Sequence, residues 1–299
     1  MRRKTTAVRI GNVVLSSEEP VLVQSMLNTS TREVDACVEQ AIRIIEAGGR
    51  LVRITAPGVK EAEMLGEIHR RLRERGYTTP ISADIHFVAE AASVAARYVE
   101  KVRINPGNFA DKRATFKKLT YTDEEYAAEL EILRQKFTEF LEVCRQYGTA
   151  VRIGTNHGSL SDRIMSRYGD TPAGMVEATM EYLRVCQACD FKDVVISLKS
   201  SDCRTMVDAV RLLVEKMEAE GMCYPLHLGV TEAGEGEDGR IRSAVGIGTL
   251  LNEGIGDTIR VSLTEEPEAE IPVACELARI CSEPEYLKGW TPLKGECSK

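Results

Sequence analysis

Short runs of alternating apolar and polar residues recur along the chain, and a longer stretch with helical periodicity follows each of them. Side chains alternate between the two faces of a strand, so these runs predict strands, and the repeated order of strand and helix predicts parallel βα units. With their trailing loops, the predicted strands occupy 21–28, 51–56, 80–87, 101–105, 150–162, 193–202, 225–239 and 256–267. The predicted helices occupy 35–48, 59–75, 88–98, 123–147, 173–189, 204–220, 241–253 and 271–282. About eight such units predict an α/β fold, a TIM (β/α)8 barrel.

Four of the predicted strands carry one arginine among aliphatic or β-branched neighbours: LVRIT at 51–55, KVRIN at 101–105, AVRIG at 150–154 and TIRVS at 258–262. In a barrel the aliphatic face of a strand packs on the outer helices and the other face points inward. Active sites of this fold lie at the carboxyl ends of the strands. We therefore expect the arginines to converge on one site.

Strand parity gives a set of charged residues at these inward positions. The expected cations are Arg53, Arg103, Arg152, Lys199 and Arg260, the expected anions are Asp84 and Glu232, and His86 and His227 are further inward candidates. A buried unpaired charge is very costly, so each group needs a partner. Internal ion pairs are one solution, but two acids are too few for five cations. Because arginine suits bidentate phosphate recognition, a diphosphate or two separate phosphates would balance the surplus.

Composition limits the classes of partner and location. The 299 residues carry a formal net charge of −7, which disfavours a nucleic-acid partner. No apolar run approaches the length of a membrane span, so we expect no membrane partner. The basic start, MRRKTTAVRIG, leads into no apolar segment of a secretory signal. Together with nine cysteines, this favours reduced thiols and a cytoplasmic location.

Several isolated motifs have ordinary structural explanations. Cys186 and Cys189 form a C-x-x-C pair, but no second pair lies nearby, which favours core or surface thiols over a metal or redox site. The glycine pairs at 234–236 and 246–248 lack the G-x-G-x-x-G pattern between strand and helix, and are typical of turns and packing.

Six motifs, in order, resemble the family of 4-hydroxy-3-methylbut-2-enyl diphosphate synthases over about residues 5–270, and specifically its larger, insert-containing form. They are DIHF at 84–87, KVRINPGN at 101–108, VRIGTNHGSL at 151–160, SLKSSD at 197–202, HLGVTEAG at 227–234 and GIGDTIRVSL at 254–263. The resemblance implies an oxidoreductase of isoprenoid biosynthesis by the methylerythritol phosphate pathway. It implies the reductive ring opening and dehydroxylation of 2-C-methyl-D-erythritol 2,4-cyclodiphosphate. The electrons would come from ferredoxin or flavodoxin through a [4Fe–4S] cluster.

The resemblance also implies roles for particular residues. Glu232 matches a catalytic acid near the reacting carbon, a plausible group for proton delivery. The positions that match diphosphate binding are Arg53, Asp84, His86, Arg103, Asn105, Arg152, Asn156, Lys199, His227, Arg260 and Ser262.

The chain departs from the family pattern at the cluster. The family holds it in a separate C-terminal module with a C-x-x-C pair, a further Cys and a Glu, which Cys186 and Cys189 do not match. We therefore expect a barrel at 1–285, a tail or linker at 286–299 and no metal ligands in this chain. We expect the chain to be inactive alone, whereas the full-length protein would be a homodimer in which one subunit's cluster module caps the other's barrel.

Two other hypotheses remain open from the residues. The chain could be a complete non-redox TIM-barrel lyase or isomerase of a phosphorylated metabolite, with Lys199 as an amine nucleophile. It could also be a module that binds a phosphate ligand without chemistry.

Overall fold

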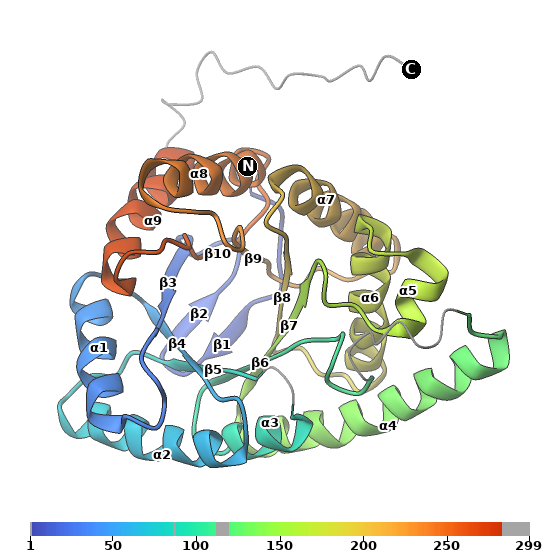
Figure 1. The fold of residues 1–299 in the computed structure, drawn as a ribbon, viewed down its shortest axis with the longest axis horizontal. Helices are drawn as coiled ribbons and strands as arrows, with labels where there is room; N and C mark the ends of the chain where they lie inside the picture. Colours follow the sequence, from blue (N-terminus) through green and yellow to red (C-terminus); the bar gives the residue numbers. More distant parts are fainter. Residues whose placement is uncertain (1, 86–87, 112–119, 283–299) are drawn as a thin grey trace.

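A ring of parallel strands surrounded by helices makes up the fold (Figure 1). The computed structural model describes residues 2–85, 88–111 and 120–282. The strands of the ring are β3 (Leu22–Met26), β4 (Leu51–Thr55), β5 (Ile81–Asp84), β6 (Lys101–Ile104), β7 (Ala150–Asn156), β8 (Val194–Lys199), β9 (His227–Leu228) and β10 (Thr258–Ile259). They pair in the order β8-β7-β6-β5-β4-β3-β10-β9, and a parallel bridge between Ile196 and Leu226 closes the ring. The predicted (β/α)8 barrel is confirmed.

The helices follow the strands as predicted, with small differences at their ends. They are α1 (Val34–Glu46), α2 (Val59–Glu74), α3 (Ala89–Ala95), α4 (Asp123–Tyr147), α5 (Asp162–Tyr168), α6 (Pro172–Ala188), α7 (Cys203–Ala219), α8 (Gly236–Asn252) and α9 (Pro267–Ser282). Helix α5 is not predicted from the sequence, and α8 and α9 begin several residues before their predicted starts at 241 and 271. None of the described helices is long and apolar enough to cross a membrane.

The long helix α4 has clear signals at both ends. Thr122 forms a capping box with Glu125, in which each side chain accepts a hydrogen bond from the other residue's backbone N–H. At the other end Gly148 takes the left-handed conformation that glycine adopts without steric cost. These signals explain why its predicted bounds, 123–147, agree with the structure.

The alternation along the strands sorts apolar from charged residues as predicted. Val102, Ile104, Val151 and Ile153 are fully buried in the apolar core that also includes helix residues such as Leu65. The arginines of the same strands lie on the opposite face, inside the barrel. The strand pattern therefore determines which side chains reach the site.

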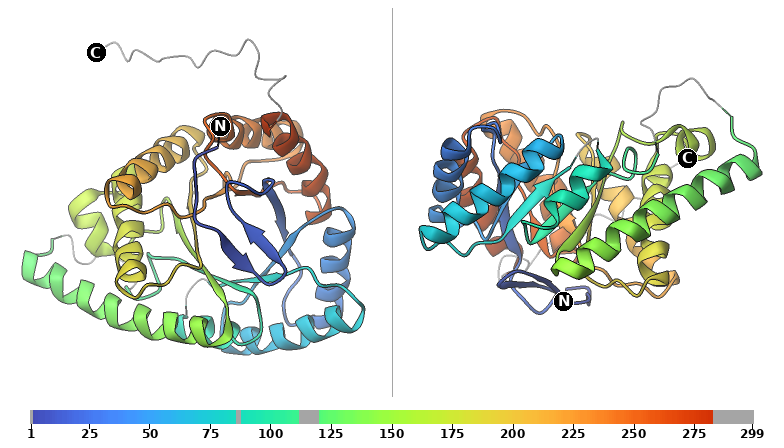
Figure 2. Two further views of the ribbon diagram at one scale, coloured as in Figure 1. Left: turned by 180° about the vertical axis from the view of Figure 1, so that it is seen from behind. Right: turned by 90° about the horizontal axis from the view of Figure 1, so that it is seen from below.

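A hairpin that the sequence analysis did not predict covers the foot of the barrel, where the strands begin. It consists of β1 (Val8–Ile10) and β2 (Val13–Leu15), which pair in antiparallel register around Gly11 and Asn12. Its apolar residues form a second buried cluster with the first inward residues of four strands, namely Leu22, Leu51, Ala150 and Val195. Figure 2 shows the hairpin lying across this end. Among the described residues, the hairpin thus closes the foot of the barrel and leaves the carboxyl ends of the strands as its open end.

Candidate anion-binding site

Neighbouring strands bring the predicted arginines to one level of the barrel. Parallel pairing places Asp84 of β5 beside Arg103 of β6, and Arg103 beside Arg152 of β7. Arg53 lies one strand further along, on β4, with its guanidinium 3.2 Å from Asp84. The alternating pattern of the strands thus places a layer of positively charged side chains inside the barrel.

These cations surround a cavity of about 190 Å³ at the carboxyl ends of the strands. It is lined by Met26, Arg53, Asp84, Arg103, Arg152, Asn156, Ser197, Lys199, Val230, Thr231, Arg260 and Ser262. Eight of the predicted site residues are in this set. Five positively charged side chains and one carboxylate line the same cavity, so its wall carries a surplus of positive charge.

Asp84 is the carboxylate that the arginines share. One of its oxygens lies 3.2 Å from Nε of Arg53, and the other lies 3.1 Å from Nη1 of Arg103 and 4.0 Å from Nη2 of Arg152. The Asp84 side chain is 1% exposed, and those of Arg103 and Arg152 are 4% and 2% exposed. One negative charge therefore serves three buried positive charges.

Arg260 has a separate partner that the sequence analysis missed. Glu270, in the first turn of α9, accepts hydrogen bonds from Nη2 of Arg260 at 2.9 Å and from Nε at 3.0 Å. The same carboxylate also accepts bonds from Oγ of Ser25 at 2.6 Å and from the backbone N–H of Leu263 at 3.2 Å. Glu270 thus connects β3, β10 and α9 behind the cavity wall.

Burial and the charges of neighbouring cations lower the pKa of three of the cavity's cations, Arg53, Arg152 and Lys199. Burial lowers the pKa of Arg53 to about 10, against the attraction of Asp84. Burial, followed by the charges of neighbouring arginines, holds the pKa of Lys199 and of Arg152 well below their usual values. An anion in the cavity would oppose both effects.

Two glycines leave space for the cationic side chains. A Cβ atom at Gly154 would lie 2.6 Å from Nε of Arg103, whose Nη2 donates to the Gly154 carbonyl at 2.7 Å. A Cβ atom at Gly229 would lie 2.9 Å from Nζ of Lys199. Arg103 and Lys199 can therefore take these positions only because Gly154 and Gly229 have no side chain.

Substitution of Gly154 by alanine is expected to displace Arg103 and weaken anion binding by about 1.5–3 kcal/mol, the range for a hydrogen bond to a charged group. Calorimetric titration with pyrophosphate would measure the change. Gly248→Ala on α8 is a matched control, because the nearest atom to its new Cβ lies 3.6 Å away. Equal affinities for wild type and Gly154→Ala would contradict this dependence of Arg103 on Gly154.

Three of the predicted residues that the structure describes do not line the cavity. Asn105 holds two loops together: its Nδ2 donates to Oγ of Ser159 at 2.8 Å, and its Oδ1 accepts from the N–H of Gly107 at 3.2 Å. His227 is buried inside the barrel, with Nδ1 2.6 Å from Nε2 of Gln24. Glu232 is exposed on the loop after β9. His86 lies outside the described residues.

The count of inward acids from the sequence therefore needs a correction. Glu232, expected among them, is exposed on its loop, where its φ of 52° is in the left-handed region that side chains rarely adopt. Glu270 occupies the barrel side of α9 instead. Among the described residues, two inward acids still face a larger number of cations. Internal ion pairs alone therefore do not balance the charge.

Lys101 is a further inward cation that the sequence analysis left out. It is fully buried on β6, two residues before Arg103 and thus on the same face of the strand. The signal was the parity that identified Arg103. For Glu270 the signal was its place on the buried stripe of α9, together with Ile271, Ala274 and Ala278.

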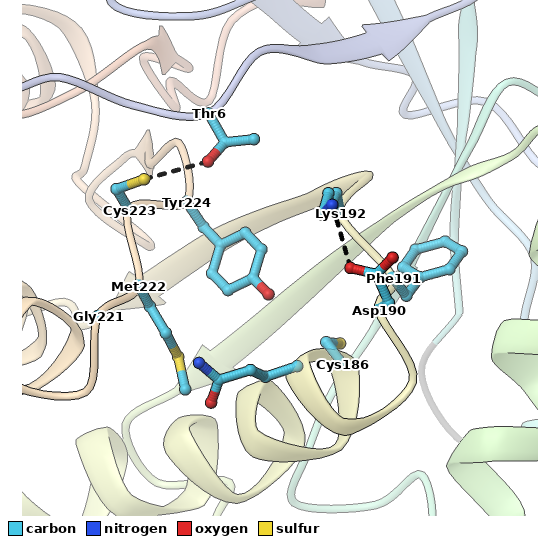
Figure 3. Close-up of a pocket in the computed structure, with 10 residues that line it drawn as sticks. Thr6, Cys186, Asp190, Phe191, Lys192, Gly221, Met222, Cys223 and Tyr224 are labelled. Carbon is cyan, nitrogen blue, oxygen red and sulfur yellow. Dashed lines mark hydrogen bonds and ion pairs between the residues drawn. The ribbon is translucent and has the colours of Figure 1, made fainter.

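Other features of the described residues show no comparable chemistry. A hollow of about 270 Å³ between Thr6, α6 and the segment 221–224 contains few charged groups, and Asp190 and Lys192 in it pair with each other at 3.1 Å (Figure 3). Cys186 is buried there and burial raises its thiol pKa, as expected for a core cysteine. Among the described residues no group of three or more His, Cys, Asp or Glu could hold a metal ion. They therefore do not fit an iron–sulfur cluster.

The fold and the cavity together define a TIM barrel with a positively charged cavity at the carboxyl ends of its strands. The model of the GcpE TIM-barrel domain family matches residues 5–275, and the chain belongs to this family. Its curated relatives include 4-hydroxy-3-methylbut-2-en-1-yl diphosphate synthase (flavodoxin) of Parabacteroides distasonis, 63% identical over 95% of this chain and 46% of the relative. The chloroplastic synthase (ferredoxin) of Arabidopsis thaliana is 52% identical over 94% of this chain and 38% of the relative. The resemblance inferred from the six motifs is confirmed, and the chain spans less than half the length of these relatives.

Solved structures of low identity share the barrel. Dihydropteroate synthase of Stenotrophomonas maltophilia superposes with a TM-score of 0.60 at 13% identity, over 94% of this chain and 98% of that one. The N-acetylneuraminic acid synthetase of Leptospira borgpetersenii superposes with a TM-score of 0.56 at 11% identity, over 99% of this chain and 95% of that one. At these identities the likeness shows the fold alone.

Proposed function

We propose that this chain is the substrate-binding barrel of a 4-hydroxy-3-methylbut-2-en-1-yl diphosphate synthase and that its cavity binds 2-C-methyl-D-erythritol 2,4-cyclodiphosphate. The observation that carries the proposal is the surplus of positive charge around one cavity, with five cations and a single carboxylate in its wall. A diphosphate supplies the missing negative charge in a form that guanidinium groups bind well. The names of the curated relatives give the reaction class.

The reaction that we propose for the whole protein opens the cyclic diphosphate reductively and removes a hydroxyl group as water. An electron pair and protons enter, and the electrons would come from ferredoxin or flavodoxin, the donors in the relatives' names. We place the [4Fe–4S] cluster of the reaction in a part of the whole protein outside this chain. A homodimer and a cytoplasmic location also remain predictions for the whole protein.

The chain's own residues would bind and orient the substrate. Arg53, Arg103, Arg152, Arg260 and Lys199 would neutralise the diphosphate, and Asn156 and Ser262 would offer uncharged hydrogen bonds from the same wall. We propose Glu232 as the acid of proton delivery, for which its loop would have to bring the carboxylate over the cavity. Asn105, whose amide joins two loops of the mouth, would act by holding their shape.

Calorimetric titration of this chain with the cyclodiphosphate tests the proposal, with pyrophosphate as a control for general anion binding. We expect saturable binding of the cyclodiphosphate that pyrophosphate does not match. Equal affinity for both would reduce the site to a general anion site. If neither binds, the same titration of a longer chain that includes the rest of the protein decides between a missing lid and a wrong ligand.

Arg152 provides the most direct test of a single residue. Its side chain is 2% exposed, and its Nε and Nη1 have no hydrogen-bond partner among the described residues. We expect Arg152→Ala to weaken diphosphate binding by about 1.5–3 kcal/mol, the range for loss of a hydrogen bond to a charged group. Unchanged affinity in the titration would remove Arg152 from the site.

One observation favours a second function, a lyase or isomerase that forms a Schiff base. The lowered pKa of Lys199 increases the fraction of its amine that is uncharged and nucleophilic. Borohydride trapping of a phosphorylated carbonyl compound on Lys199 would support this function over the reductase barrel. Absence of trapping with a panel of such compounds would leave Lys199 as a binding cation.

A further inference from the structure

Lys101 lies below the cation layer, where the described residues seal it from solvent on both sides. In the strand register it stands between Ser82 of β5 and Ala150 of β7, and Ala150 belongs to the apolar cluster under the hairpin. The residue is 0% exposed, and its Nζ has no hydrogen-bond partner among the described residues. The arginine layer lies on the cavity side of it. An amine thus sits at the boundary between the apolar foot of the barrel and the cationic site.

Other polar atoms of this level also lack partners. Oγ of Ser82, Oε1 of Gln24 and Nε2 of His227 are buried and have no hydrogen-bond partner among the described residues. Gln24 reaches His227 at 2.6 Å and Oγ1 of Thr258 at 3.3 Å through its other amide atom. Buried polar groups are usually satisfied by protein or by ordered water. This layer of the barrel therefore contains buried polar atoms to which a proton could be added. Its described residues include no carboxylate.

The charges around Lys101 oppose an ammonium group. Arg152 of β7 and Arg53 of β4 repel it, and Asp84 of β5 is the carboxylate that attracts it. That carboxylate already serves Arg53 and Arg103 at 3.2 and 3.1 Å. His227 of β9 also faces this group of cations, and burial, followed by their charges, holds its pKa well below the usual value. An anion in the cavity would lower the positive potential at Lys101 and so favour the charged form of its amine.

We propose that Lys101 is a positioning residue whose amine is uncharged in the empty barrel and takes up a proton when a diphosphate occupies the cavity above it. The proton comes from solvent or from the ligand: the donor's O–H bond breaks, an N–H bond forms on Lys101, and no other bond changes. The positive charge added to Lys101 attracts the anion from the foot side of the cavity, without a direct contact between the two. This inference rests on the proposed function, because it needs an anion in the cavity.

The uncharged amine predicts how stability depends on pH. Burial, followed by the charges of Arg152 and Arg53, lowers the pKa of Lys101 in the folded chain well below its usual value. Between that value and the unfolded pKa of about 10.4 the unfolded chain binds more protons, so this group makes stability rise with pH. Lys101→Met lacks this dependence. We expect the variant to be more stable than wild type at neutral pH, by a margin that shrinks as the pH approaches 10.4.

Proton uptake during binding is the decisive measurement. Pyrophosphate is titrated calorimetrically at about pH 8 into wild type and Lys101→Met, in buffers of different ionisation enthalpy. We expect the variant to take up fewer protons per bound pyrophosphate, by as much as about one, and to bind more weakly. Lys216→Met, on the exposed side of α7, is the matched control and should behave as wild type. The comparison cancels protons taken up by pyrophosphate itself and by Lys199.

The possible outcomes separate this inference from the function on which it rests. Binding with equal proton uptake in wild type and Lys101→Met would overturn the role of Lys101 and leave the anion site intact. A Lys101→Met variant less stable than wild type at neutral pH would show a charged, paired lysine and would also overturn it. If pyrophosphate and the cyclodiphosphate both fail to bind wild type, in this chain and in a longer chain that includes the rest of the protein, the proposed anion site fails and the inference with it.

Discussion

Replacement of Asp84 by asparagine is expected to lower the free energy of unfolding by about 3–5 kcal/mol, the usual cost of removing one partner from buried ion pairs. Asparagine has nearly the same shape but no charge, so Arg53, Arg103 and Arg152 lose the carboxylate that they share. Urea unfolding followed by circular dichroism would measure the loss. Because the variant has a larger surplus of positive charge, we also expect pyrophosphate to stabilise it more than it stabilises wild type.

Asp208→Asn is the control for this substitution. Asp208 lies on the exposed side of α7, 3.8 Å from Arg204 and 3.7 Å from Arg211, and exposed pairs of this kind contribute about 0–1 kcal/mol. A loss in Asp84→Asn no larger than in Asp208→Asn would mean that the arginines do not depend on the carboxylate. Some other group would then neutralise the arginines, and the surplus positive charge of the cavity would not explain ligand binding.

The fold was predictable because each strand carries its own signal. In KVRIN and AVRIG the alternation separates Val and Ile from Arg, and the structure places the two kinds of side chain on opposite faces. The hairpin at 8–15 was missed although Val8, Ile10, Val13 and Leu15 alternate around Gly11, which has a positive φ. Short strands of three residues give too little pattern to stand out from a basic, polar segment. The predicted ranges 225–239 and 256–267 included trailing loops, and within them the paired strands β9 and β10 are two residues long each.

The members of the site were less predictable than its charge. Parity along a strand identifies an inward residue, so it finds Arg103 and Arg152, but it says nothing of a partner that arrives from a helix. Glu270 reaches Arg260 only because α9 folds back against β3 and β10. For Glu232 the prediction of an inward side chain was wrong. Its place just after a strand predicts that orientation, but Glu232 is exposed on a loop in which Gly234 and Gly236 have positive φ. Tertiary contacts and loop geometry, which have no local pattern, decide both cases.

The ion pair of Glu270 and Arg260 leads to the second large prediction. Glu270→Gln is expected to lower the free energy of unfolding by about 3–5 kcal/mol, because Arg260, whose side chain is 13% exposed, would remain largely buried without its counter-charge. The carboxylate accepts four hydrogen bonds, two at each oxygen. In glutamine an NH2 group replaces one oxygen and faces donors whichever way the amide turns. Arg260 also lines the cavity, so weaker diphosphate binding should accompany the loss of stability.

A matched control lies on the same helix. Glu276 pairs with Arg279 at 2.7 Å, with about half of each side chain exposed, and Glu276→Gln should change stability by about 0–1 kcal/mol. The double variant Glu270→Leu, Arg260→Met removes both buried charges and should recover a large part of the stability lost in Glu270→Gln, because the uncompensated guanidinium is gone. The double variant should regain stability but not affinity for diphosphate, since Arg260 is the member of the pair that lines the cavity. Recovery of both would mean that Arg260 supports α9 and takes no part in binding.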